Sequence, residues 1–151
     1  MITAPEGVPT DLFRDPKVWK HDDTYYVVCG ASQNGFAQAR LYKSTDMFHW
    51  EFVNVLAESR GEWGYMWECP DFFAMDDQYV LIASPQDLPA DEELHNGNNS
   101  VYFLGDYDKM QHEFHSNKPC LLDEGLDFYA EYNTKFTKGD KFSVIEGHLK
   151  G

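Results

Sequence analysis

An internal repeat with a spacing of 54 residues constrains the fold of this chain more than any other feature. Residues 15–28 and 69–82 align with a proline, a pair of aspartates and a tyrosine at matching positions. The runs that flank each Asp-Asp pair are apolar in both copies. Turn residues between two β-prone runs favour a hairpin, so each copy is predicted to form strand, turn, strand.

The similarity continues beyond the hairpins. Residues 39–44 resemble 100–105 as a third strand, and 46–52 resemble 108–114, which lead into a fourth. Four short strands per unit of about fifty residues is the period of a β-propeller blade. We therefore predict an all-β fold, a fragment of a β-propeller with about two four-stranded antiparallel blades plus the start of a third. An antiparallel sandwich is the alternative fold, but it does not explain the repeat.

The repeat also divides the chain into segments. Residues 1–12 are a lead-in, and 13–130 are a partial propeller with blades at about 13–56 and 68–122. The next blade begins at 127–130, which repeats 71–74, and the tail 131–151 matches no motif and holds a candidate hairpin turn. Because blades bury their faces on neighbouring blades, two of them are expected to leave apolar surface for self-association.

Charge and composition exclude several classes of function. Twelve basic and twenty-six acidic residues give a net charge of −14, which disfavours nucleic-acid and membrane partners. The N-terminus has no basic or apolar leader segment, so we expect a cytoplasmic protein. The three cysteines and six histidines are not grouped at metal-ligand spacing, and neither a metal nor a cofactor is expected.

Two carboxylates are the candidate catalytic residues. The first strand of each blade lines the channel of a propeller, and the repeat makes Arg14-Asp15 equivalent to Glu68-Cys69. Asp15 and Glu68 are therefore expected to face one cavity, as glycoside cleavage requires. The apolar stretch 65–70 favours a protonated Glu68, which suits a general acid. The alternatives are a Glu68 paired with a basic residue and an Asp15 that only forms a turn.

Two further features are weaker candidates. The polar stretch 84–99 is predicted to be a loop, either contacting sugar hydroxyls or simply solvated. Lys17, Lys20 and Arg40 are candidate cations for a substrate phosphate, although solvated surface charge is the alternative for each.

At these residues the chain resembles glycoside hydrolase family 32, which contains invertases, fructanases and sucrose-6-phosphate hydrolases. The resemblance covers about residues 11–130. It is carried by four motifs in order: Phe13-Arg14-Asp15-Pro16, Trp67-Glu68-Cys69-Pro70-Asp71, Ser84-Pro85-Gln86 and Asp127-Phe128-Tyr129-Ala130.

The resemblance implies a five-bladed propeller, followed in the family by a β-sandwich, and a retaining mechanism with an aspartate nucleophile. It makes Glu68 the general acid/base and Asp15 the residue that holds the fructosyl hydroxyls and stabilises the transition state. Arg14 would be a neighbouring substrate contact. Asp127 and Tyr129 would line the sugar pocket. No cofactor is implied.

The chain also departs from the family pattern. The nucleophile motif, of the type Trp-Met-Asn-Asp-Pro-Asn-Gly, does not occur in the 151 residues, and 131–133 do not match the expected Pro-Gln-Thr. We therefore predict part of a hydrolase of β-fructofuranosides, sucrose or sucrose 6-phosphate, that is inactive alone. The alternative is a non-catalytic carbohydrate-binding or self-associating propeller fragment. A related hydrolase of arabinosides or xylosides fits the Glu-Cys-Pro-Asp stretch less well.

Overall fold

The computed structural model describes residues 2–88 and 99–122 of the chain. A single 3-10 turn, η1 (Thr10–Leu12), precedes the first sheet. That sheet is antiparallel and its strands lie in chain order: β1 (Phe13–His21), β2 (Thr24–Gln33), β3 (Phe36–Ser44) and β4 (Glu51–Ser59).

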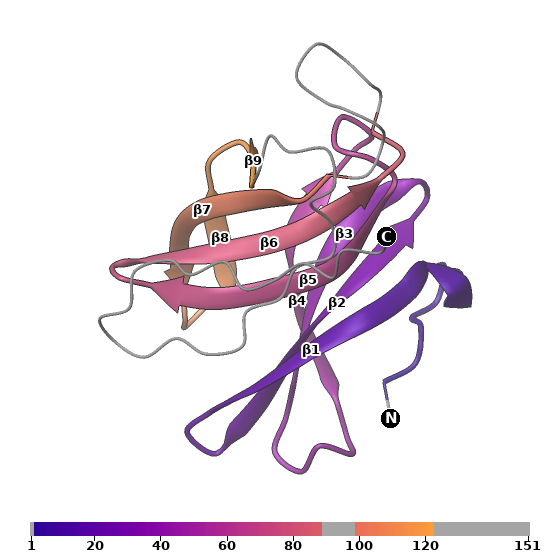
Figure 1. Cartoon of the computed structure of the whole chain (residues 1–151). Helices are drawn as coiled ribbons and strands as arrows, with labels where there is room; N and C mark the ends of the chain where they lie inside the picture. Colours follow the sequence, from indigo (N-terminus) through magenta and orange to yellow (C-terminus); the bar gives the residue numbers. More distant parts are fainter. Residues whose placement is uncertain (1, 89–98, 123–151) are drawn as a thin grey trace, which may run out of the picture.

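The second sheet repeats this order. Its strands are β5 (Met66–Met75), β6 (Gln78–Gln86), β7 (Val101–Asp108) and β8 (Glu113–Ser116), and the short β9 (Cys120–Leu121) pairs with β7. The two sheets pack on each other, with β5 against β1 and β2 (Figure 1). The repeat predicted blades at 13–56 and 68–122. The predicted third blade start at 127–130 and the tail 131–151 lie outside the described residues. Within the part of the chain that is described, no helix is long and apolar enough to cross a membrane.

Equivalent aspartates close the first hairpin of each sheet. His21 pairs with Thr24, and Met75 pairs with Gln78, so each turn has two residues. The first residue of each turn is left-handed, with φ 51° at Asp22 and 52° at Asp76. Aspartate tolerates this conformation better than most residues, which explains why the Asp-Asp pair recurs.

Equivalent aspartates also shape the turn before the fourth strand. Oδ1 of Asp46 accepts hydrogen bonds from the backbone N–H groups of Phe48 and His49, both at 2.8 Å. Oδ1 of Asp108 accepts in the same way from Met110 and Gln111, at 2.8 and 3.0 Å. The repeat therefore extends to single hydrogen bonds, as expected of two copies of one structural unit.

The main core lies between the two sheets and is rich in aromatic rings. Trp67 is fully buried; its ring lies 5.1 Å from that of Phe103, and its indole N–H donates to the Trp63 carbonyl at 2.8 Å. The backbones of the two sheets approach each other closely at Gly30, where a Cβ would lie 2.0 Å from the Trp67 carbonyl oxygen. This contact fixes β5 against β2 one residue before Glu68.

Candidate functional site

The first strands of the two sheets begin with the same irregularity. The register of β1 on β2 shifts between Arg14 and Lys17, and that of β5 on β6 shifts between Glu68 and Asp71. Inside each bulge one residue is left-handed, with φ 56° at Asp15 and 47° at Cys69. Bulges redirect side chains and are common beside active sites. These two occupy positions 54 residues apart, so they are copies of one feature.

Three of the polar contacts between the two bulged strands join equivalent residues. Arg14 Nη2 lies 2.9 Å from Glu68 Oε1, Asp15 Oδ2 accepts from the Cys69 backbone N–H at 3.0 Å, and Lys17 Nζ lies 3.4 Å from Asp71 Oδ2. Each contact joins positions separated by 54 residues, so β1 and β5 meet in register. The structure therefore brings Arg14, Asp15 and Glu68 together, whereas Asp127 and Tyr129 lie outside the described residues.

Glu68 combines an apolar setting with a basic partner. Its side chain is 16% exposed, and Met66, Trp67 and Pro70 beside it are fully buried. The Arg14 guanidinium, 35% exposed, contacts one of its oxygens. A basic partner for Glu68, which is the alternative to a catalytic role, is therefore present in the structure. A carboxylate has about four acceptor positions, so the contact of Arg14 with Oε1 leaves capacity for a further partner.

Asp15 ties the two bulges together. Its Oδ2 receives the Cys69 N–H and lies 3.8 Å from the Cys69 sulfur. An ionised carboxylate has about four acceptor positions, so this contact leaves room for hydroxyl donors from a sugar.

The cysteine between the two carboxylates is not poised as a nucleophile. Burial, together with the negative charges of Asp15 and Glu68, raises the pKa of Cys69 to about 11. Burial, followed by the charge of Asp15, raises the pKa of Cys29 to about 12. Both thiols are protonated at neutral pH, and thiol nucleophiles react as thiolates.

Gln86 is a site residue that sequence reasoning missed. We predicted a polar loop from residue 84 onward, but β6 continues to Gln86 and Ser84 is buried, so that prediction was wrong for 84–86. The Gln86 side-chain oxygen accepts hydrogen bonds from Arg14 Nη2 at 2.9 Å and from the Tyr65 hydroxyl at 3.1 Å. Extension of the regular hairpin pairing from Asp76-Asp77 would place Gln86 opposite Trp67, and the bulge between Glu68 and Asp71 shifts it to face Met66.

The candidate phosphate-binding cations have other contacts. Arg40 is buried and donates to the side-chain oxygens of Gln38 at 2.7 Å and Gln33 at 2.9 Å. Lys20 lies over the Tyr25 ring, 5.3 Å from its centroid. Lys17 pairs with Asp71, as described above. Of the three cations, Arg40 is the one that is buried and hydrogen-bonded within the first sheet.

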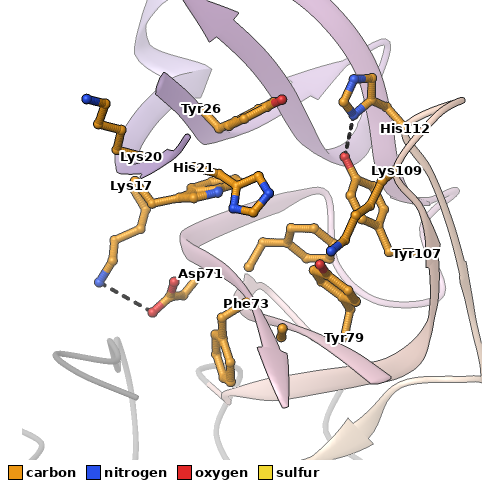
Figure 2. Close-up of a pocket in the computed structure, with 13 residues that line it drawn as sticks. Lys17, Lys20, His21, Tyr26, Asp71, Phe73, Tyr79, Tyr107, Lys109 and His112 are labelled. Carbon is orange, nitrogen blue, oxygen red and sulfur yellow. Dashed lines mark hydrogen bonds and ion pairs between the residues drawn. The ribbon is translucent and has the colours of Figure 1, made fainter. Parts of the chain in front are cut away.

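A groove of about 680 Å³ lies further along β1 and β5. Figure 2 shows its aromatic lining, the Lys17–Asp71 pair on one side and the Tyr107–His112 hydrogen bond on the other; the latter joins Oη and Nδ1 at 2.6 Å. The candidate cations Lys17 and Lys20 line this groove, whereas Arg14, Asp15 and Glu68 do not. Among the described residues, no three or more histidines, cysteines or acidic residues are grouped to hold a metal ion.

Comparison with known proteins identifies the family. The model of the glycosyl hydrolases family 32 N-terminal domain matches residues 1–146. The sucrose-6-phosphate hydrolase of Bacillus subtilis is 40% identical over 141 residues, which cover 89% of this chain and 29% of the relative. The sucrose-6-phosphate hydrolase of Escherichia coli is 39% identical, over 99% of this chain and 31% of the relative.

Solved structures agree with the sequence matches. The Bombyx mori family 32 β-fructofuranosidase superposes with a TM-score of 0.78 at 43% identity, over 82% of this chain and 27% of that one. The sucrose-6-phosphate hydrolase of Lactobacillus gasseri gives 0.73 at 34% identity, over 85% and 28%.

These matches agree with the motifs and extend them. The family match continues beyond residue 130, where the recognisable motifs end, and the chain spans about a third or less of these relatives. The two sheets are blades of a β-propeller. The chain therefore belongs to glycoside hydrolase family 32.

Proposed function

We propose that this chain is part of a retaining glycoside hydrolase that cleaves β-fructofuranosides, namely sucrose or sucrose 6-phosphate. The observation that carries the proposal is the meeting of two equivalent bulges, which brings Asp15 and the Arg14–Glu68 pair to one place. The relatives named above act, by their names, on sucrose 6-phosphate and β-fructofuranosides, which supports the substrate class.

Glu68 is the proposed general acid/base. It donates a proton to the glycosidic oxygen as the bond to the leaving sugar breaks, and then takes a proton from the water that releases fructose. The carboxylate that attacks the anomeric carbon is supplied from outside residues 1–151, since these residues lack the family's nucleophile motif.

Asp15 and Arg14 are the proposed substrate contacts. Asp15 accepts hydrogen bonds from fructosyl hydroxyls while its Oδ2 remains bound to the Cys69 N–H. Its negative charge stabilises the oxocarbenium-like transition state, in which positive charge develops on the sugar ring. Asp127 and Tyr129 remain proposed pocket residues on the basis of their motif alone.

The test is Glu68→Gln in a complete enzyme that contains this chain. The amide keeps the size of the side chain but cannot donate a proton as an acid does, so kcat on sucrose should fall by about 10²–10⁴-fold. Glu51→Gln is the control, because the Glu51 side chain is exposed and should leave kcat unchanged. Full sucrose turnover by the Glu68→Gln enzyme removes the assignment.

The substrate class can be narrowed with the same enzyme. Because several similar relatives are named sucrose-6-phosphate hydrolases, we expect a higher kcat/KM for sucrose 6-phosphate than for sucrose. A higher kcat/KM for unphosphorylated sucrose would assign the enzyme to the invertases instead.

A further inference from the structure

We infer that Gln86 and Tyr65 are positioning residues that hold Arg14 against Glu68; the inference rests on the proposed role of Glu68 as the acid. The four side chains form one continuous network of polar contacts. Tyr65 donates to the Gln86 oxygen, and Arg14 Nη2 donates to the same oxygen while it pairs with Glu68 Oε1.

The chemistry of the partners fixes the orientation of the Gln86 amide. A guanidinium has no acceptor, so the atom that faces Arg14 Nη2 must be the oxygen of Gln86 and not its nitrogen. The Tyr65 hydroxyl then also donates to this oxygen. Both contacts require a hydrogen-bond acceptor at the end of a side chain of this length.

The two contacts of Arg14 share one nitrogen. Nη2 carries two hydrogens, and Glu68 and Gln86 each lie 2.9 Å from it. Two partners on one nitrogen define the orientation of the guanidinium plane, which a single contact leaves free to rotate. This matters for arginine in particular, because fixing its long side chain costs about 2 kcal/mol of conformational entropy.

Gln86, the anchor of Arg14, is itself held in a fixed position relative to Glu68. Gln86 is the last residue of β6 and pairs with Met66 on β5, two residues before Glu68. Its neighbour Pro85 and Met66 are fully buried. The Gln86 oxygen and the Glu68 carboxylate therefore come from neighbouring strands of one sheet, and the guanidinium reaches both from β1 of the other sheet.

Loss of the anchor should affect the proton transfer from Glu68 and not the fold in general. A sugar leaving group needs that proton, whereas a nitrophenolate leaves readily without it. A defect in the position of Glu68 is therefore larger on sucrose than on a nitrophenyl β-fructofuranoside. A general loss of structure lowers both activities equally.

The test uses Gln86→Met, which keeps the length of the side chain and removes the oxygen acceptor. In a complete enzyme containing this chain, kcat/KM, which reports the cleavage of the leaving-group bond and not the later attack of water, should fall about tenfold on sucrose and stay within about twofold on the nitrophenyl substrate. Tyr65→Phe keeps Gln86 and should show the same dependence on the leaving group with a smaller loss. It also provides the test if Gln86→Met does not fold.

Gln33→Met is the matched control. Gln33 ends β2 as Gln86 ends β6, and its oxygen likewise accepts from an arginine, Arg40 Nη2, at 2.9 Å. This variant loses the same kind of bond away from Glu68, so any loss of activity should be equal on the two substrates.

Failure of the positioning role and failure of the proposed acid role of Glu68 give different results. Equal activity losses on both substrates in Gln86→Met and Tyr65→Phe, or no loss in either, overturn the positioning role. Glu68→Gln is measured alongside on both substrates. If it too shows no dependence on the leaving group, the proposed acid role of Glu68 fails, and the positioning role fails with it.

Discussion

Asp15 and Cys69 have backbone conformations that few non-glycine residues adopt. A left-handed conformation at such a residue costs about 1–3 kcal/mol and persists where surrounding contacts impose it. Here the contact is mutual, since the carboxylate of one left-handed residue accepts the N–H of the other. The strain lies beside the two residues to which we assign chemistry, Glu68 and Asp15 itself.

Substitution of Asp15 should therefore reduce stability as well as activity. Asp15→Ala leaves the Cys69 N–H without its acceptor and puts alanine in a left-handed position, so unfolding free energy should fall by about 2–4 kcal/mol. Asp15→Asn retains an oxygen and tolerates this conformation, and it should lose at most about 1 kcal/mol. Urea denaturation of residues 1–151 measures both values. Equal losses would show that the hydrogen bond does not stabilise the bulges.

Cys29 should make the fold sensitive to alkali. Burial, then the charge of Asp15, raises its folded pKa from 9.0 to about 12, so above pH 9 the unfolded state loses the thiol proton first. The contribution of this thiol to the free energy of unfolding is fully present below pH 9. It falls by about 1.4 kcal/mol per pH unit as the pH rises toward 12. Cys29→Ala should remove this part of the pH dependence in denaturation curves at pH 8 to 11. An unchanged slope would contradict the contribution of Cys29.

Strands β1, β2, β5 and β6 are the elements that build the site. β1 and β5 carry the bulges, Gly30 on β2 lets β5 approach, and β6 supplies Gln86. Because a Cβ at Gly30 would lie 2.0 Å from the Trp67 carbonyl oxygen, the absence of a side chain there sets the distance between the blades.

Gly30→Ala should be among the most damaging small substitutions in the chain. The methyl group meets backbone and not a flexible side chain, so β2 and β5 must separate, and unfolding free energy should fall by about 3 kcal/mol or more. Gly35→Ala is the control. It has no atom within 4 Å of the new Cβ and only the cost of φ 79°, about 1 kcal/mol. Comparable losses in the two variants would argue against a steric role for Gly30.

For the strands and their pairing, prediction from the sequence was more successful than for the contacts of the site. The 54-residue repeat and the Asp-Asp pairs predicted the hairpins, because turn chemistry is local. The same repeat made Arg14 equivalent to Glu68, and these two residues are in contact. The left-handed φ at Asp15 and Cys69 was not predictable, since neither residue type requires it. The motif Ser84-Pro85-Gln86 marked this stretch, but the role of Gln86 was missed because a polar residue after an apolar run suggests a loop. Its hydrogen bonds to Tyr65 and to Arg14 on the other blade explain it.

The described residues form two blades, and the chain spans less than a third of the Bacillus subtilis relative. The proposed acid and its partners come from both blades, so the described residues assemble these groups without further chain. The proposed nucleophile is the part of the mechanism that must come from elsewhere.

Residues 1–151 alone should therefore release no glucose from sucrose, because no glycosyl-enzyme can form without the attacking carboxylate. A coupled glucose assay on the pure chain measures this, with a complete enzyme as the positive control. Detectable release would contradict the assignment of the nucleophile to another part of the protein. Titration calorimetry with fructose on the same sample separates an inert chain from a carbohydrate-binding one.

Self-association of residues 1–151 is a separate expectation. Apolar side chains such as Phe48 and Phe52 are exposed, at 74% and 53%, and Phe52 lies against Tyr42 on the first sheet. Exposed apolar patches favour association, so light scattering should give a mass above that of a monomer. A monodisperse monomer would contradict this expectation.

The most direct measurement of the catalytic site is a crystal structure of a complete enzyme carrying Glu68→Gln with sucrose bound. We expect the fructosyl ring to hydrogen-bond Asp15, with the glycosidic oxygen within reach of the residue 68 amide. Sucrose bound elsewhere, or bound with its glycosidic oxygen turned away from residue 68, would contradict the proposed site.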